Sequence, residues 1–150
     1  MQGLTNMNSS PAKQHWEDIY QTKDTAREVS WYQDTPKTSI DLILSTGVDI
    51  NANVIDIGGG DSRLADNLFE LGFKNISVLD ISAKALQKAK TRLGKKGKSV
   101  IYIEADILEF GTESRFDIWH DRAAFHFLTK EEDIVRYVEI AGKFIKPSGY

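Results

Sequence analysis

Apolar residues along this chain alternate between two spacings: short continuous runs, and recurrences every three or four positions. Continuous runs indicate buried strands of a parallel sheet, and the second spacing indicates helices with one buried face. Strands are predicted at 54–57, 76–79, 100–103 and 116–119. Helices are predicted at 15–20, 35–46, 64–71, 82–93 and 129–145. Strands that alternate with helices predict an α/β fold with an open, mainly parallel sheet and helices on both faces.

Residues that favour helix ends mark the limits of three predicted helices. Thr35 is predicted to cap a helix whose first residue is Pro36, and Ser82 to cap the helix after the second strand. Thr129 and Glu132 have the spacing of a capping box for the last helix. The positions of that helix expected to face inward are Ile134, Val138, Ala141 and Ile145.

The first predicted strand ends in an acid and three glycines, Asp56-Ile57-Gly58-Gly59-Gly60. Glycines permit a sharp turn and let the backbone lie against a ligand, and a strand, glycine loop and helix form the nucleotide-binding half of an open α/β sheet. A dinucleotide fingerprint needs glycine where this chain has Arg63, which disfavours a nicotinamide-dependent oxidoreductase. The alternative is that the glycines only make a tight turn.

Four acids, Asp56, Asp80, Asp106 and Asp121, fall at or just after the ends of successive predicted strands. Parallel strands end at one edge of a sheet, and open α/β sheets bind their ligands there. Asp80 follows the glycine loop by about 20 residues, the spacing of an acid that accepts hydrogen bonds from ribose hydroxyls. The residues beside it offer no positive group for a 2′-phosphate, so an unphosphorylated adenosine-type ribose is favoured.

The composition narrows the class of protein. With 150 residues and a formal net charge of -3, the chain is expected to be one domain without the basic surface that nucleic acids require. It contains no cysteine, which excludes disulfides, thiolate catalysis and zinc–cysteine sites. No apolar run is long enough to span a bilayer, and residues 1–13 lack the apolar core of a signal peptide. A cytoplasmic location is therefore expected.

From Asn53 to Gly149 the chain resembles the core of the class I (Rossmann-like) S-adenosylmethionine-dependent methyltransferases. Five segments carry the resemblance: 56–60 as the first motif, 78–80 as the second, 104–106 as the third, and then 116–121 and 146–149. The resemblance implies a Rossmann-like, doubly wound fold and S-adenosyl-L-methionine as the cofactor. It also implies transfer of a methyl group to a small molecule or a protein side chain.

The same resemblance implies roles for individual residues. Gly58 and Gly60 would contact the methionine portion of the cofactor, Asp80 its ribose and Asp106 its adenine amino group. The whole set expected to bind the cofactor is Trp31, Tyr32, Asp56, Gly58, Gly59, Gly60, Asp80, Ile81, Asp106, Ile107 and His120.

Within this set, two pairs of apolar residues are expected to cover the cofactor. Ile81 and Ile107 would flank the adenine by the resemblance. Trp31 and Tyr32 are similar to a segment that folds over the cofactor in small methyltransferases, and aromatic rings suit an adenine or a cationic sulfonium. The alternative is that these two rings close one end of the core.

Methyl transfer from a sulfonium needs an aligned nucleophile and the exclusion of water, and an amine acceptor must also lose a proton. By position, Asp121, His120 and His126 are candidate bases, and Asp121 and His126 are predicted as the catalytic residues. The structural alternatives are an ion pair between Asp121 and Arg122, and a wall position for His126 between two phenylalanines. No metal is predicted, because two histidines without a third ligand make a poor site.

The segment after the fourth strand lacks the Asn/Asp-Pro-Pro-Tyr run that some amino-group methyltransferases place there. This departure disfavours glutamine and adenine in nucleic acid as acceptors, and leaves small molecules and protein lysine. The alternative function is a truncated or non-catalytic module that binds S-adenosylmethionine and acts through contacts with a partner.

Residues 1–14 are expected to be a flexible segment, and 15–150 a methyltransferase-like cofactor-binding domain with a helical lid at 15–48 and a core at 53–150. The fold is expected to be truncated after the fourth strand and its following helix, with strand order 3-2-1-4. The fourth strand would then be an exposed edge. We expect a second copy of the chain, giving a homo-oligomer, or the N-terminal segment to cover that edge.

Overall fold

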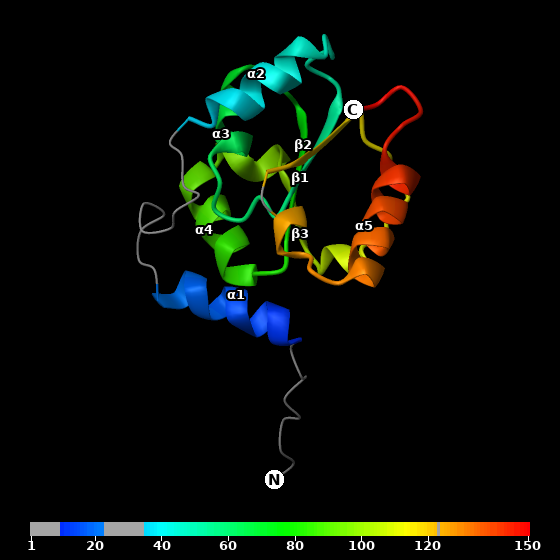
Figure 1. Ribbon diagram of the computed structural model, residues 1–150. Helices are drawn as coiled ribbons and strands as arrows, with labels where there is room; N and C mark the ends of the chain where they lie inside the picture. The colour runs from blue at the N-terminus through cyan, green and yellow to red at the C-terminus, as the bar shows by residue number, and fades with distance from the viewer. Residues whose placement is uncertain (1–9, 23–34, 123) are drawn as a thin grey trace.

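The structure is a computed structural model, which describes residues 10–22, 35–122 and 124–150. A parallel sheet runs through the middle of the molecule (Figure 1). Its strands are β1 (Asn53–Ile57), β2 (Asn75–Asp80), β3 (Ile101–Glu104) and β4 (Ile118–Asp121), in the order β3-β2-β1-β4. Each neighbouring pair is parallel. The predicted α/β class and strand order are confirmed.

Helices cover both faces of the sheet (Figure 1). One face carries α2 (Lys37–Ser45), α3 (Leu64–Glu70) and α4 (Ala83–Leu93), and the other carries α5 (Glu131–Phe144). Neighbouring residues of β1 belong to different cores, because side chains alternate across a strand: Val54 packs on the α3 side and Ile55 on the α5 side. None of the helices in the described ranges has the length and apolar character of a membrane span.

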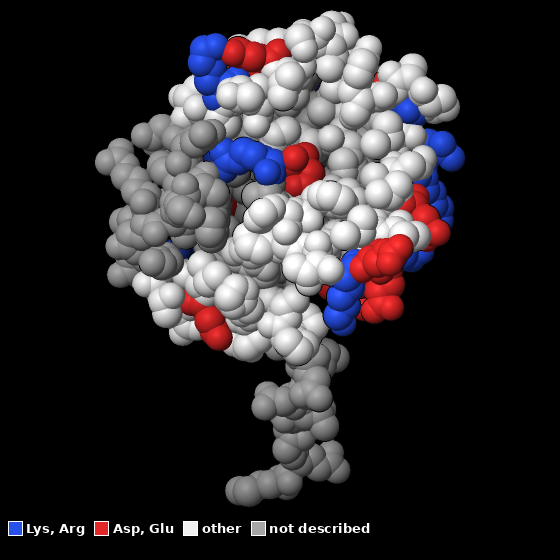
Figure 2. Space-filling view, viewed as in Figure 1, with Lys and Arg blue, Asp and Glu red and all other residues white. Residues whose placement is uncertain are grey.

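Short 3-10 helices complete the chain: η2 (Lys96–Ser99), η3 (Ile107–Glu109) and η4 (Phe125–Phe127). On the face shown in Figure 2, charged side chains gather at α5 and at the start of α2, and basic and acidic side chains also lie near the middle beside uncharged surface. Two rings of η4, Phe125 and Phe127, are among the exposed large apolar side chains of the described chain.

The first helix, α1 (Pro11–Thr22), lies across the end of the molecule where α4 begins (Figure 1). The helix predicted at 15–20 is therefore present but longer, and it includes four residues of the segment 1–14 that was expected to be flexible. Lys13 of α1 forms an ion pair with Glu104 at the end of β3. Lys84 at the start of α4 donates a 2.7 Å hydrogen bond to Gln21. These contacts fasten α1 over the carboxyl ends of β2 and β3.

One of the three predicted helix caps is confirmed. The Ser82 hydroxyl accepts a 3.1 Å hydrogen bond from the backbone N–H of Ala85. The prediction that Thr35 caps a helix beginning at Pro36 is wrong by one residue, because Pro36 is itself the capping residue and the helix begins at Lys37. No side-chain cap bond forms there.

The prediction for the start of α5 is also wrong, and the prediction for its buried face is wrong in part. Thr129 and Glu132 form no capping box, because Lys130 takes the capping position without a side-chain bond. Tyr137 fixes the rotation of the helix, since its hydroxyl accepts a 3.0 Å hydrogen bond from Trp119 on β4. The buried positions of α5 are consequently Tyr137, Ile140 and Phe144. Of the predicted positions, Ala141 is partly buried against this core, whereas Val138 is 59% exposed.

The fourth strand begins at Ile118, two residues later than predicted, and the edge of β4 is already paired in part. Phe116 forms an isolated parallel bridge with Ile145, after α5. Tyr150 donates a backbone hydrogen bond to Asp117 and accepts one from Trp119, each 2.8 Å long. At these positions the segment after α5 covers the edge, so the prediction that the N-terminal segment or a second copy covers it is wrong here. The homo-oligomer stays a prediction.

Candidate functional site

A cavity of about 290 Å³ lies at the carboxyl ends of the strands, beneath α1. Ligand pockets occur at this edge of open α/β sheets, where strand order reverses. Eight residues expected from the sequence to bind the cofactor line it: Asp56, Gly58, Gly59, Asp80, Ile81, Asp106, Ile107 and His120. The fold therefore brings the predicted glycine loop and three of the four predicted acids around one cavity.

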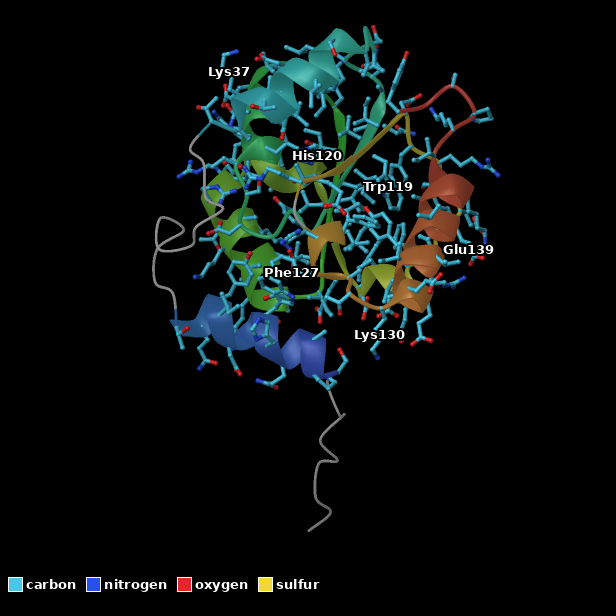
Figure 3. All side chains as sticks on the ribbon, viewed as in Figure 1. Lys37, Trp119, His120, Phe127, Lys130 and Glu139 are labelled. Carbon is cyan, nitrogen blue, oxygen red and sulfur yellow. The ribbon has the colours of Figure 1, made fainter. Side chains whose placement is uncertain are left out.

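One wall of the cavity comes from α1, through Ala12, Trp16 and Tyr20. Trp16 also packs edge-on against Phe127 of η4, with ring centroids 4.9 Å apart, and Figure 3 shows Phe127 beside α1. Sequence reasoning identified the i, i+4 spacing of Trp16 and Tyr20 as an amphipathic helix, but it did not assign them to the site. The pair Trp31–Tyr32, which was expected to cover the cofactor, lies outside the described residues.

The glycine loop has little room for side chains. Gly58 and Gly60 have φ angles of 62° and 45°, in the left-handed region that favours glycine. A Cβ atom on Gly58 would stand 2.7 Å from the Cβ of Ala124, and one on Gly59 would stand 2.6 Å from Oδ2 of Asp56. Neither position has room for a side chain. The backbone of Gly58 and Gly59 therefore lines the cavity directly.

Asp80, at the end of β2, is only 6% exposed. Its Oδ1 accepts a 2.8 Å hydrogen bond from the backbone N–H of Ser82. The pKa of Asp80 is raised from 3.8 to about 7, chiefly by burial, with smaller contributions from the carboxylates of Asp56 and Glu17. Its neighbour Gly60 does not line the cavity but lies against Asp80, because a Cβ there would stand 2.8 Å from Oδ2.

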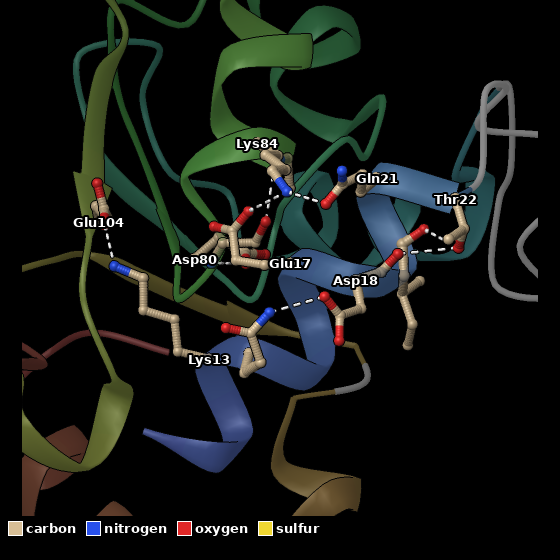
Figure 4. Close-up of polar contacts among 12 residues, drawn as sticks. Lys13, Glu17, Asp18, Gln21, Thr22, Asp80, Lys84 and Glu104 are labelled. Atoms are coloured by element: carbon tan, nitrogen blue, oxygen red, sulfur yellow. Dashed lines mark hydrogen bonds and ion pairs between the residues drawn. The ribbon is translucent and has the colours of Figure 1, made fainter. Parts of the chain in front are cut away.

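Glu17 of α1 lies beside Asp80 and is half-buried, with both of its carboxylate oxygens out of contact with solvent (Figure 4). Within the described chain, neither of its carboxylate oxygens has a hydrogen-bond partner, although Lys84 Nζ lies 3.8 Å from Oε2. Buried acceptors without donors are costly. Of these two acids Asp80 lines the cavity, where the hydroxyl groups of a ligand would supply donors, as the two hydroxyls of a ribose do.

Asp106 also lines the cavity and caps the start of η3. Its Oδ1 accepts a 3.0 Å hydrogen bond from the backbone N–H of Leu108, which leaves Oδ2 for a ligand. The lining beside it is apolar and consists of Ile81, Ala105, Ile107, Leu108 and Leu128. A narrow apolar wall with a carboxylate acceptor suits a flat ring that carries an N–H group.

Asp56 and His120 face each other across β1 and β4, where they are paired in register. The Nδ1 atom of His120 lies 2.7 Å from Oδ1 of Asp56, and its Nε2 atom lies 2.8 Å from the hydroxyl of Ser39 on α2. Both imidazole nitrogens are therefore engaged within the protein. His120 lines the cavity as a fixed wall residue.

The two predicted catalytic residues lie beside the cavity and do not line it. Asp121 Oδ1 accepts a 2.8 Å hydrogen bond from the backbone N–H of Ala124, and Oδ2 accepts a 2.5 Å bond from the Tyr137 hydroxyl. Burial raises the pKa of Asp121, and these bonds oppose the rise. His126 is exposed on η4. The geometry gives Asp121 a role in holding the turn after β4, and catalysis by Asp121 and His126 stays a prediction.

An open parallel sheet with a glycine loop and an acid at each of three strand ends defines a nucleoside-cofactor fold. The profile of the family described as "Methyltransferase domain" matches residues 54–149. The chain therefore belongs to the class I S-adenosylmethionine-dependent methyltransferase family, as the resemblance indicated.

Individual relatives agree with the family. The chain is 26% identical over 152 residues to "EEF1A lysine methyltransferase 2" of Homo sapiens, a match that covers 92% of this chain and 64% of that protein. It is 31% identical over 101 residues to "N-terminal Xaa-Pro-Lys N-methyltransferase 1-A" of Xenopus laevis, covering 66% of this chain and 45% of that protein. The chain thus spans about two thirds or less of these relatives.

Among solved structures, the fold is similar to the N-methyltransferase NodS from Bradyrhizobium japonicum WM9 in complex with S-adenosyl-L-homocysteine. The TM-score is 0.74 at 19% identity, and the match covers 91% of this chain and 69% of that one. At this identity the likeness supports the fold.

Proposed function

We propose that this chain binds S-adenosyl-L-methionine and transfers its methyl group to an amino nitrogen, most directly that of a protein lysine or a protein N-terminus. The observation that carries the proposal is that the glycine loop, buried Asp80 and Asp106 all line one cavity. Small-molecule acceptors remain in the proposed class. The names of the relatives in Homo sapiens and Xenopus laevis favour protein amines over them.

Each part of the cavity has a task in this proposal. The backbone at Gly58 and Gly59 holds the methionine portion, Asp80 accepts hydrogen bonds from the ribose, and Asp106 accepts one from the adenine amino group. Trp16 and the rest of α1 exclude water from the covered cavity. The cofactor supplies a methyl carbon that its sulfonium has already activated, so the protein contributes alignment more than covalent chemistry.

The proton balance follows from the acceptor. A neutral amine forms the nitrogen–carbon bond while the carbon–sulfur bond breaks and its electron pair moves to sulfur. The amine must arrive without its extra proton or lose it on the way. Asp121 and His126 do not line the cavity, so we propose that the proton lost by the amine passes to solvent.

The surface beside the cavity supports a protein or apolar acceptor. Phe125 and Phe127 of η4 are exposed apolar rings, and Phe127 also lines the cavity. An apolar rim beside a cavity is typical of a surface that binds another molecule. The net charge of -3 disfavours nucleic acid as that molecule. The proposed location is cytoplasmic, since a sequence without cysteine gains nothing from an oxidising compartment.

Two measurements test this function in order. Calorimetric titration with S-adenosyl-L-homocysteine should show saturable binding that Asp80→Ala abolishes. Transfer of a radiolabelled methyl group should then be measured on peptides with free or blocked lysine and N-terminal amines, with Asp80→Ala as the control. Binding with no transfer to any amine would favour the non-catalytic module. The proposal would be abandoned if no binding occurred.

A further inference from the structure

A fourth acid, Asp133, lines the cavity together with Asp56, Asp80 and Asp106. Asp133 lies in the first turn of α5, and not at a strand end, where the sequence predicts site residues. Two other acids of that turn, Glu131 and Glu132, are exposed and do not belong to the described lining. Of the three acids in the first turn of α5, only Asp133 belongs to the described lining of the cavity.

The contact between α5 and η3 sets the position of Asp133. Arg136, one turn further along α5, donates a 3.3 Å hydrogen bond from Nε to the backbone carbonyl of Leu108 in η3. Residues three apart share one side of a helix, so Asp133 faces the same direction as Arg136. Asp133 is half-buried, and its carboxylate forms no hydrogen bond or ion pair with any described residue. It is an acceptor beside the cavity with no donor of its own.

Leu108 connects the two acids, because its N–H binds Asp106 and its carbonyl binds Arg136 of the helix that carries Asp133. Asp106 keeps one free oxygen, because its other oxygen binds the N–H of Leu108. An exocyclic amino group carries two N–H donors and one carboxylate oxygen satisfies only one of them. We propose that Asp133 accepts the second hydrogen of the adenine amino group while Asp106 accepts the first. This assignment rests on the proposed function and adds a residue that selects a 6-amino over a 6-oxo purine.

The test compares two ligands on the full chain. S-adenosyl-L-homocysteine carries the 6-amino group, and S-inosyl-L-homocysteine carries a carbonyl oxygen at the same position. Their dissociation constants should be measured by calorimetry for the wild type, for Asp133→Ala and for Glu132→Ala. Glu132→Ala is the matched control, because it removes the same charge from the same exposed helix turn and leaves the cavity unchanged.

Asp133→Ala should weaken S-adenosyl-L-homocysteine about tenfold, as expected for loss of a hydrogen bond to a charged acceptor. The same change should leave S-inosyl-L-homocysteine unchanged or bound more tightly, since a carbonyl oxygen is repelled by a carboxylate. Glu132→Ala should alter neither. Equal weakening of both ligands, or no change for S-adenosyl-L-homocysteine, would overturn the assignment. If the wild type bound neither ligand, the proposed function itself would fail.

Discussion

Gly58 and Ala124 approach so closely that a Cβ atom on Gly58 would stand 2.7 Å from the Cβ of Ala124. The two residues follow neighbouring strands, β1 and β4, and both line the cavity. The glycine loop therefore has two structural requirements at this position. The backbone needs a φ angle of 62°, and the turn after β4 needs the space that a side chain would occupy.

Gly58→Ala and Gly47→Ala separate these two requirements. Both glycines have left-handed φ angles, but nothing lies within 4 Å of a Cβ placed on Gly47. Each change should cost about 1–2 kcal/mol of backbone strain. Only Gly58→Ala should also displace the turn at Ala124 and abolish binding of S-adenosyl-L-homocysteine. Thermal unfolding and calorimetry measure the two effects. Full binding by Gly58→Ala would contradict the tight contact.

Asp80 should make the stability of the ligand-free protein depend on pH. Its pKa is raised from 3.8 to about 7 by burial, so the folded chain holds a proton that the unfolded chain releases between those values. The free energy of unfolding should therefore fall as pH rises from about 4 to 7. Asp80→Asn removes this contribution, so at pH 8 it should unfold at a higher temperature than the wild type. If the unfolding temperatures of Asp80→Asn and the wild type were the same at every pH from 5 to 8, the raised pKa of Asp80 would be disproved.

Ligand affinity should have the opposite dependence on pH. Ribose hydroxyls donate to the carboxylate form of Asp80, and below pH 7 this form must first lose its proton. The dissociation constant of S-adenosyl-L-homocysteine should rise up to about tenfold for each pH unit below 7. Proton release, measured by calorimetry in buffers of different ionisation enthalpy, should accompany binding at pH 6 and vanish at pH 9. A constant affinity from pH 5.5 to 8 would show that the ribose does not bind the ionised acid.

The sequence predicts best the parts of the site where the backbone itself determines which residue is possible. Gly58 needs an unusual φ angle, Asp80 ends β2 and Asp106 closely follows β3, so each leaves a local signal. Asp133 leaves none, because one helix turn holds three acids and only the packing of α5 on η3 decides which of them reaches the cavity. The rotation of α5 is likewise set by Tyr137 meeting Trp119, a contact between residues of different elements.

Ser39 supports the site through His120. Its hydroxyl lies 2.8 Å from Nε2, while Asp56 lies 2.7 Å from Nδ1. Ser39→Ala should leave Nε2 of His120, which is part-buried, without its hydrogen-bond partner. This change should lower the free energy of unfolding by about 1–3 kcal/mol. Ser45→Ala on the same helix is the control, because Ser45 is exposed and hydrogen-bonds only to Leu42 of its own helix. Urea unfolding of both variants gives the comparison, and equal stability of the two would show that the Ser39 contact contributes nothing.

The bonds around Asp121 distinguish a structural carboxylate from a catalytic base. Asn at this position can still accept from the Ala124 N–H and can bond to the Tyr137 hydroxyl, which both donates and accepts. Asp121→Asn should therefore keep kcat within a few fold, whereas loss of a general base typically costs 10²–10⁴-fold. Tyr137→Phe removes bonds to both Asp121 and Trp119 and should lower the free energy of unfolding by about 1–3 kcal/mol. Single-turnover methyl transfer, measured from pH 6 to 9, tests the first expectation and urea unfolding the second. A hundredfold loss of kcat in Asp121→Asn, together with loss of the acidic limb of the pH profile, would restore Asp121 as the base.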